Sequence, residues 1–429
     1  MNKIILSLAG VLAATAFAPE ASALPAFARQ TGMACTACHQ QHFPVLSKFG
    51  RAFKAGGYTM MGSQGKVEGE HLSIPDTLNA AILVKVRYQK NNLPATLNKK
   101  ALNLPNGVND GQLQFGDEFS LFFGGRVAEN IGFLFEGNTV AAGGALLAGF
   151  KLPVMFDAGG AKLSVIPFTT DALGAQYGYE LSSGGVMRAN RWAEHRRETS
   201  AIQYNADQGP DGGAATGFAF VAQNDMGYIN YTRWAAAYGM GSNGGAAPSY
   251  ELGSNYIRVA ATPSVGDWAM VVGAGAMTGE SHINGAPAIP GPLAAGDFVE
   301  TKQSFVDLQA HGALGENELG VYAQYANAPV AAAGATSAYG AGATARKAFT
   351  LGADYSVIPH VLTLGAAYRN AKNGGTAGSE GDNAITLTAV YDLVQNVALH
   401  ANYSKYSGSA NNAANSVTNQ YTLLLEAAW

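Results

Sequence analysis

Apolar and polar residues alternate one by one along much of the chain after about residue 76. The pattern is clearest at 349–357, 362–369, 384–393 and 397–404, where aliphatic and aromatic side chains are separated by small or polar ones. Successive side chains of a β-strand point to opposite faces, so this period of two predicts strands with one face toward lipid and the other toward a lumen. His311 and His400 fall on the lumen side of such strands.

The last segment of this kind runs to the end of the chain. Tyr421, Leu423, Leu425, Ala427 and Trp429 occupy alternate positions. A terminal aromatic residue on an alternating strand is typical of the signal that the outer-membrane assembly machinery reads. The alternative is an ordinary amphipathic strand that happens to end in Trp.

The connections between the segments are of two lengths, which alternate. Short turns are predicted at 129–130, 227, 263–266, 315, 359 and 395–396. Longer polar or glycine-rich connections are predicted at 91–111, 241–249, 280–296, 329–342, 373–382 and 408–417. Outer-membrane barrels have short periplasmic turns and long outer loops. The alternation therefore predicts an up-and-down antiparallel barrel with both termini periplasmic and an even number of strands, about 16 to 18.

Residues 157–214 leave the strand number open. The polar run at 190–197 does not alternate as a strand should. Either it belongs to a helical or in-folded loop that narrows the pore, or it is a plain turn or surface loop.

Composition agrees with an exported barrel. Of the 429 residues, 13% are charged, 48% are hydrophobic and 54 are glycine. After the N-terminus no apolar run is long enough to cross a membrane as a helix. The net charge of −4 argues against a nucleic-acid partner.

The N-terminus has the three parts of a secretory signal peptide. Lys3 supplies the positive charge, 4–18 is the apolar stretch, and Ala21, Ser22 and Ala23 form an A-x-A cleavage site. The chain then divides into a signal peptide at 1–23, a short segment at 24–75 and an outer-membrane barrel at 76–429.

Cys35 and Cys38 are the only two cysteines, and His39 follows directly. Two thiols at this spacing add to the two vinyl groups of a porphyrin, and the adjacent imidazole becomes an axial ligand of the iron, so the motif predicts one covalent haem c. A disulfide between the two residues is the structural alternative, since the predicted compartment is oxidising. A thioredoxin-like dithiol would need a βαβ context, and a closed zinc site would need four ligands.

About fifty residues, 24–75, carry this motif, which is a marginal length for an independent domain. Leu46, Phe49 and Phe53 share helical spacing, so 45–54 is predicted to be an amphipathic helix that faces the haem and ends at Gly56. Its other face would carry Lys48, Arg51 and Lys54. These side chains would steer an acidic electron partner, pair with haem propionates or simply be solvated.

The runs 27–39, 41–44 and 49–54, with the layout of signal peptide, one haem segment and barrel, closely resemble the fused monohaem cytochrome–porins of the outer membrane of iron-oxidising bacteria. The resemblance implies that Cys35 and Cys38 attach the haem and that His39 is its axial ligand. It favours 16 strands over 18. The apolar band of such a barrel is roughly 25 Å tall and would separate a haem hanging in the periplasm from an external donor, so the haem segment is expected in the barrel mouth or lumen. The implied role is to take electrons from extracellular Fe(II) and pass them to a soluble periplasmic cytochrome or another carrier.

The sixth ligand of the haem iron is left open. Met60, Met61 and His71 are candidates, Met33 is a weaker one, and His42 is too close to His39 to reach the opposite haem face easily. A Met/His pair would raise the reduction potential.

No strong site for iron is predicted in the outer loops. The pairs Glu280 with His282 and Glu380 with Asp382 offer at most a transient site for a hard cation. Fe(II) then donates its electron in a brief encounter at the pore mouth. A diffusion porin with a haem-bearing plug or sensor is the alternative function, and a conduit for a different extracellular donor is a third.

Overall fold

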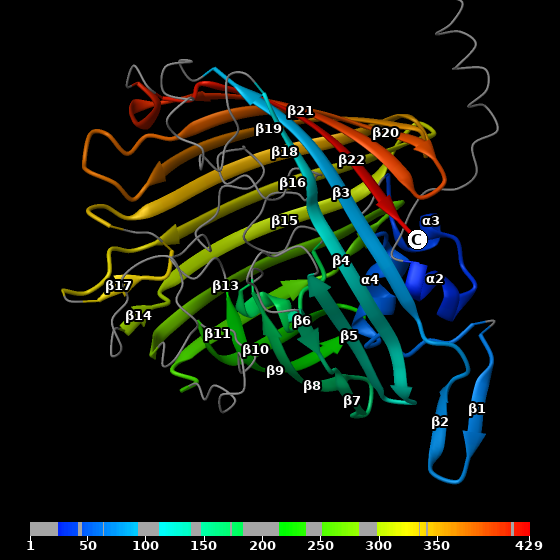
Figure 1. The fold of residues 1–429 in the computed structure, drawn as a ribbon. Helices are drawn as coiled ribbons and strands as arrows, with labels where there is room; N and C mark the ends of the chain where they lie inside the picture. The colour runs from blue at the N-terminus through cyan, green and yellow to red at the C-terminus, as the bar shows by residue number, and fades with distance from the viewer. Residues whose placement is uncertain are drawn as a thin grey trace, which may run out of the picture.

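The computed structural model describes residues 25–41, 45–62, 64–92, 111–138, 147–171, 174–182, 214–236, 251–282, 298–333, 335–339, 342–412 and 416–429. Its main body is a closed barrel in which neighbouring wall strands are antiparallel and β22 pairs with β3 to complete the circle (Figure 1). The predicted signal peptide and the run at 190–197 lie outside the described residues, as does His42.

The strands of the first half of the barrel are β3 (Ala80–Asn91), β4 (Gln112–Ala128), β5 (Ile131–Asn138), β6 (Leu147–Lys151), β7 (Val154–Asp157), β8 (Lys162–Thr170), β9 (Ala215–Asn224), β10 (Gly227–Ala235), β11 (Ser254–Ala261) and β12 (Ser264–Val265). Those of the second half are β13 (Trp268–His282), β14 (Phe298–Glu300), β15 (Gln303–Leu314), β16 (Asn317–Ala328), β17 (Thr336–Ser337), β18 (Arg346–Ile358), β19 (Leu362–Asn373), β20 (Asn383–Val394), β21 (Val397–Ser407) and β22 (Asn419–Ala428).

The described residues form a wall of sixteen strands, counting β6 with β7, β11 with β12 and β14 with β15 as single interrupted strands. The short strand β17 pairs in parallel with β14 and lies in the connection between β16 and β18. The predicted antiparallel barrel of about 16 strands is therefore confirmed, and the lower of the two strand counts holds.

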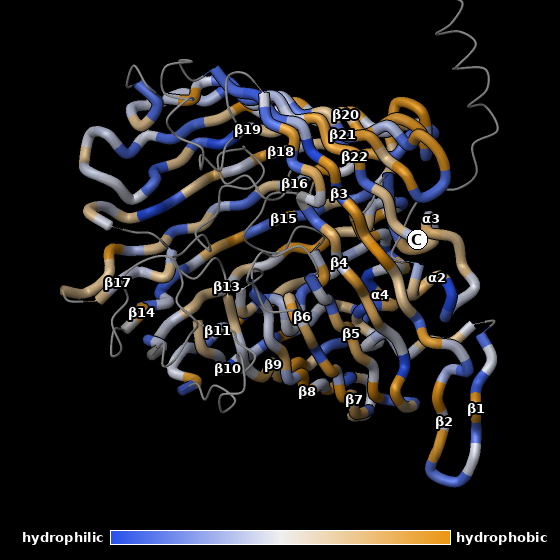
Figure 2. Tube along the Cα trace, in the orientation of Figure 1, coloured by the Kyte–Doolittle hydropathy of each residue, from blue (hydrophilic) through white to orange (hydrophobic). Residues whose placement is uncertain are grey.

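The predicted alternation is also present in the wall, as the colours along the strands in Figure 2 show. In β22, Leu423 is 44% exposed on the outside whereas Leu424 is fully buried on the inside. His311 and His400 are buried, as their lumen positions require. An apolar outer face with a polar interior is the arrangement of a barrel that sits in lipid.

Trp429 belongs to the wall. Its backbone N–H donates to the carbonyl of Ile82 at 3.0 Å, and the N–H of Ile82 donates to the carbonyl of Trp429 at 2.8 Å. The last residue of the chain therefore extends the strand pairing that closes the barrel.

Three short helices precede the barrel: α2 (Pro25–Thr31), α3 (Cys35–Cys38) and α4 (Lys48–Ala55). A hairpin of β1 (Lys66–Gly69) and β2 (Leu72–Pro75) follows them. In the described part of the chain, none of the helices has both the length and the apolar character needed to span a membrane. The helix predicted at 45–54 begins later, because Ser47 caps α4 while Val45 and Leu46 are extended beside the haem motif.

The helices lie at one end of the barrel (Figure 1). This is the end at which short turns join β4 to β5, β9 to β10 and β15 to β16, as predicted. Side chains from the helical segment bond to wall residues close to these turns, for example Gln41 to Glu318. The helical segment is therefore packed into the mouth of the barrel at its short-turn end.

Residues 174–182, which include the short helix η2 (Ala175–Tyr177), follow β8 and are buried. Asn230 on β10 donates from Nδ2 to the carbonyl of Tyr179 at 3.2 Å, so the segment lies against the inner wall. This described part of 157–214 is folded into the lumen, whereas the run at 190–197, to which the two alternatives referred, lies outside the described residues.

Candidate functional site

The two cysteines of the predicted haem c motif lie on a single helical turn, and His39 follows it. Helix α3 consists of Cys35 to Cys38, and residues three apart on a helix share one face, so both sulfur atoms emerge on the same side. Burial and, to a smaller extent, the neighbouring Cys35 raise the pKa of the Cys38 thiol. One-sided display of two thiols on a rigid turn is the geometry that thioether attachment to one porphyrin edge needs.

His39 leaves the helix in an extended conformation, with φ −115° and ψ 141°. Its backbone forms an isolated β-bridge with Leu46, and its Nδ1 lies 3.2 Å from the carbonyl oxygen of Val45. A carbonyl only accepts, so Nδ1 carries the proton and Nε2 carries the lone pair that a metal would use. The backbone at 45–46 therefore selects the tautomer that suits an axial ligand.

Helix α4 is tied directly to the motif through Ser47 and Gly50. The N–H of Ser47 donates to the carbonyl of Cys38 at 2.9 Å, and its hydroxyl donates to the carbonyl of Ala37 at 2.8 Å. The same hydroxyl accepts from the N–H of Gly50 at 3.1 Å, which caps the helix. Gly50 touches the motif so closely that a Cβ there would lie 2.1 Å from the carbonyl oxygen of Cys38.

The loop that carries His39 is also fixed to the barrel wall. Gln41 donates from its backbone N–H to a carboxylate oxygen of Glu318 at 2.8 Å, and from Nε2 to the carbonyl of Asp354 at 2.7 Å. Gln40 donates from Nε2 to the carbonyl of Gly312 at 3.3 Å. Strands β15, β16 and β18 thus hold one side of the motif.

An aromatic cluster holds the other helices. Phe27 of α2 stacks on Tyr58 at a centroid distance of 5.0 Å and meets the edge of Phe53 at 5.1 Å. Phe49, which the spacing placed on the same face as Phe53, is partly exposed. Helix α4 therefore packs on α2 through Phe53.

The candidates for the sixth ligand are divided between two places. The segment of Met60 and Met61 runs beside the end of α2, because Gln30 donates from Nε2 to the carbonyl of Met60 at 2.8 Å. Met33 follows α2 on the way to α3. His71, by contrast, is exposed at the tip of the β1–β2 hairpin, which projects away from the helices (Figure 1).

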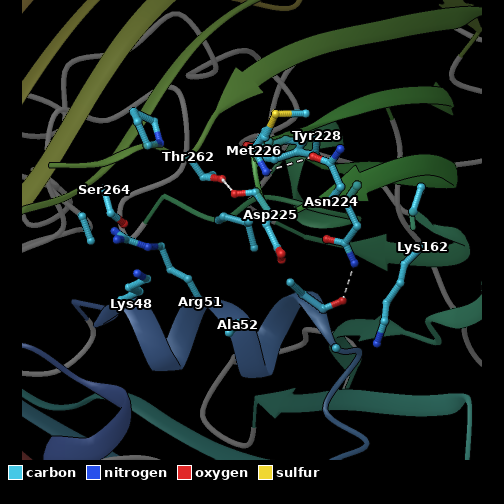
Figure 3. Close-up of a pocket in the computed structure, with 18 of the residues that line it drawn as sticks. Lys48, Arg51, Ala52, Lys162, Asn224, Asp225, Met226, Tyr228, Thr262 and Ser264 are labelled. Atoms are coloured by element: carbon cyan, nitrogen blue, oxygen red, sulfur yellow. Dashed lines mark hydrogen bonds between the residues drawn. The ribbon is translucent and has the colours of Figure 1, made fainter. Parts of the chain in front are cut away.

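A cavity of about 1270 Å³ lies on the other side of α4 (Figure 3). Its α4 wall is Lys48, Arg51, Ala52 and Ala55, and turns between β7 and β8, between β9 and β10, and after β11 complete it. Arg51 is 5% exposed, and this burial lowers its pKa to about 10, so it stays charged at neutral pH. The cavity and the haem motif therefore meet opposite faces of α4.

The lumen contains an ionic cluster that the sequence analysis missed. Arg258 is fully buried, with Nε 2.9 Å from a carboxylate oxygen of Glu180 and Nη2 2.9 Å from one of Asp307. The hydroxyl of Tyr228 donates to Glu180 at 2.8 Å. This cluster fixes residues 174–182 inside the barrel. Arg258 and Asp307 are charged residues on alternating strands, at lumen positions, and this pattern in the sequence could have revealed the cluster.

Of the two pairs predicted in the outer loops, the structure describes Glu380 with Asp382 completely and Glu280 with His282 only in part. Lys372 lies 2.7 Å from Glu380, and Arg369 lies 2.8 Å from Asp382, so each carboxylate already has a cation beside it. The side chain of His282 lies outside the described residues. Within the described ranges, no group of three or more His, Cys, Asp and Glu side chains is arranged to hold a metal ion.

No protein-family model and no curated protein matches the chain. Among solved structures it is similar to the trimeric form of OmpT from Vibrio cholerae, at 13% identity and a TM-score of 0.47 over 82% of this chain and 99% of that one. It is also similar to the channel DcaP of Acinetobacter baumannii, at 12% identity and a TM-score of 0.45 over 82% and 97%. A porin mutant of Rh. blastica gives 12% identity and a TM-score of 0.44 over 82% and 100%.

The class of the protein follows from its own barrel. A closed antiparallel wall of sixteen strands with an apolar outer face is that of an outer-membrane β-barrel of porin size.

Proposed function

We propose that the protein is an outer-membrane cytochrome–porin that oxidises extracellular Fe(II) and passes the electrons to a periplasmic carrier such as a soluble cytochrome. The proposal rests on one observation above all: Cys35 and Cys38 on a helical turn, with His39 directly after it, match a haem c motif, and this segment packs inside the end of a barrel. A thiol pair that served only as a disulfide would not need the adjacent imidazole to be oriented.

The residues of the site fit haem c. Cys35 and Cys38 would form its two thioether bonds, and His39 would bind its iron through Nε2. Bound in this way, haem c supplies a centre that gains and loses one electron. The chain's own part is to fix the two sulfur atoms on α3 and to orient the imidazole through the carbonyl of Val45. Met60 and Met61, beside the end of α2, are the better placed candidates for the sixth ligand.

Orientation is part of the proposal. The signal peptide would export the chain, and short turns face the periplasm in barrels of this class. The haem segment would then lie near the periplasmic acceptor, and Fe(II) would approach through the long-loop end. Each Fe(II) loses one electron and leaves as Fe(III), and the carrier is reduced by that electron.

The contents of the lumen favour a conduit over a diffusion porin. A diffusion porin needs a lumen that is open from end to end. Within the described residues, α2, α3 and α4 occupy part of one mouth, and residues 174–182 are fixed in the interior by Arg258. Electron transfer needs Fe(II) to enter the lumen from the long-loop end only, so an obstruction at the short-turn mouth does not prevent it.

The test uses the purified protein in liposomes with its long-loop end outside. A pyridine haemochrome assay should give one covalent haem per chain, and Fe(II) added outside should reduce it, as followed by the absorbance of the haem. His39→Ala should retain a heat-modifiable barrel and lose this reduction. If Fe(II) leaves the haem oxidised while small solutes pass freely, the porin alternative is correct. Reduction by another external donor but not by Fe(II) would keep the conduit and change its substrate.

A further inference from the structure

The barrel wall contacts the axial-ligand loop through a buried histidine. His311 on β15 is 2% exposed, and its Nδ1 lies 3.1 Å from the carbonyl oxygen of Leu46. Its Nε2 lies 3.0 Å from the hydroxyl of Tyr322 on β16, and the two rings meet edge to face with centroids 5.5 Å apart. Tyr322 is fully buried. A wall histidine therefore lies between a wall tyrosine and the loop that holds His39.

The hydrogen bonds of this pair have a fixed direction. The carbonyl of Leu46 only accepts, so Nδ1 of His311 must donate to it. Nε2 of the same neutral ring then carries a lone pair and accepts from the hydroxyl of Tyr322. The carbonyl of Leu46 thereby selects the tautomer of His311, and the hydroxyl of Tyr322 holds the ring through its other nitrogen.

Leu46 is the residue through which this contact reaches the motif. It forms the β-bridge with His39, its predecessor Val45 accepts the bond from His39 Nδ1, and its successor Ser47 donates to the carbonyl of Cys38. Movement of the Leu46 carbonyl would therefore move the partners of His39 and of Cys38 together. His311 therefore contacts the same backbone segment, 45–46, that orients the imidazole of His39.

The wall is built to accommodate the pair. His311 and Gly320 are direct cross-strand partners in the register of β15 and β16. A Cβ at Gly320 would lie 2.7 Å from the hydroxyl oxygen of Tyr322, which is too close. The absence of a side chain at this position lets the Tyr322 hydroxyl reach His311.

We propose that His311, held between the hydroxyl of Tyr322 and the carbonyl of Leu46, is a positioning residue for the axial ligand His39, so that the barrel wall sets the properties of the haem. The inference rests on the proposed function, because it takes His39 to be a haem ligand. It adds that the N-terminal segment does not determine its own haem site by itself. His311, which lies 265 positions after Leu46, completes the site.

The experiment compares His311→Phe, His311→Asn, Tyr322→Phe and His400→Phe in the full-length protein. Phe keeps a ring at 311 and removes both nitrogen atoms, whereas the amide of Asn can still donate to Leu46. His400 is the matched control, since it is an equally buried lumen histidine on β21. Heat modifiability establishes that each barrel is folded.

Three quantities are measured on each holoprotein: the midpoint potential of the haem, the low-spin ferric electron paramagnetic resonance spectrum, and hydrogen exchange of the Ser47 amide. His311→Phe should shift the potential and the spectrum, speed exchange at Ser47, and slow reduction by Fe(II) about tenfold, the lower end of what loss of an outer-shell partner costs. Tyr322→Phe should change all of them in the same direction but less. His311→Asn and His400→Phe should resemble the wild type.

The outcomes separate this inference from the function on which it rests. Wild-type potential, spectrum and exchange in folded H311F would overturn the positioning role, as would an H311N variant that is as altered as H311F. If H311F does not assemble, Y322F decides by the same readouts. A wild-type protein without covalent haem would overturn both proposals. Shifted spectra together with no reduction by Fe(II) would support the positioning role and overturn only the proposed donor.

Discussion

Gly50→Ala tests whether the contact between α3 and α4 determines the geometry of the proposed haem site. An added Cβ would lie 2.1 Å from the carbonyl oxygen of Cys38, whereas real Cβ atoms stay at least 3.0 Å from such neighbours. The two backbones must therefore separate by about 0.9 Å at this point. Backbone cannot yield as a flexible side chain would, so the strain falls on the residues that precede His39.

The cost can be estimated from three contributions. Forced backbone shifts in a packed site cost about 1–3 kcal/mol. The bond from the Ser47 N–H to the same carbonyl, now 2.9 Å, would stretch, at a further cost of about 1 kcal/mol. Alanine regains about 1 kcal/mol in helix propensity over glycine. The net loss is about 1–3 kcal/mol of local stability, and His39 moves by a substantial part of the 0.9 Å.

Haem content per barrel, the ferric absorbance spectrum and heat modifiability are the assays. We expect G50A to keep its barrel and to contain about tenfold less correctly ligated haem. Disturbing the groups that support a metal ligand typically lowers metal binding by at least this factor. Gly56→Ala is the matched control, because its Cβ would lie 3.4 Å from the carbonyl of Ala52, an ordinary contact. A G50A protein with wild-type haem content and spectrum would show that the close approach is unimportant.

Three further results are expected. Glu180→Gln leaves the fully buried Arg258 with less compensating charge, at a local cost of about 3–5 kcal/mol. Residues 174–182 should loosen and single-channel conductance in planar bilayers should rise; unchanged conductance would contradict a role in closing the lumen. Either Met60→Ala or Met61→Ala should abolish the methionine charge-transfer band in the near infrared, whereas a changed spectrum in His71→Ala would favour bis-histidine ligation. Lys372 lowers the pKa of Glu380 by hydrogen bonding. The stabilisation is therefore present above the ordinary carboxyl pKa of 4.5 and lost as pH falls through the lowered value. Hydrogen exchange in the loop at 376–382 should quicken over that acid range, and in Lys372→Ala this pH dependence should flatten.

The sequence by itself determined the features that depend on neighbours along the chain. Alternation predicts strands because the side chains of consecutive residues point to opposite faces, whatever the partner strands are. The lumen positions of His311 and His400 followed from this rule. The spacing of Cys35 and Cys38 on one helical turn, with His39 directly after it, is likewise local, so the candidate site was visible in the sequence.

Only the tertiary structure decided how distant residues meet. The start of α4 at Lys48 depends on the cap that Ser47 forms while it also bonds to the haem motif. Arg258, Glu180 and Asp307 are separated along the chain and come together because the barrel closes around residues 174–182. His311 reaches Leu46 only because the register of β15 and β16 sets it opposite Gly320 and beside Tyr322. Local periodicity fixes which face a side chain occupies, but register and closure fix what it touches.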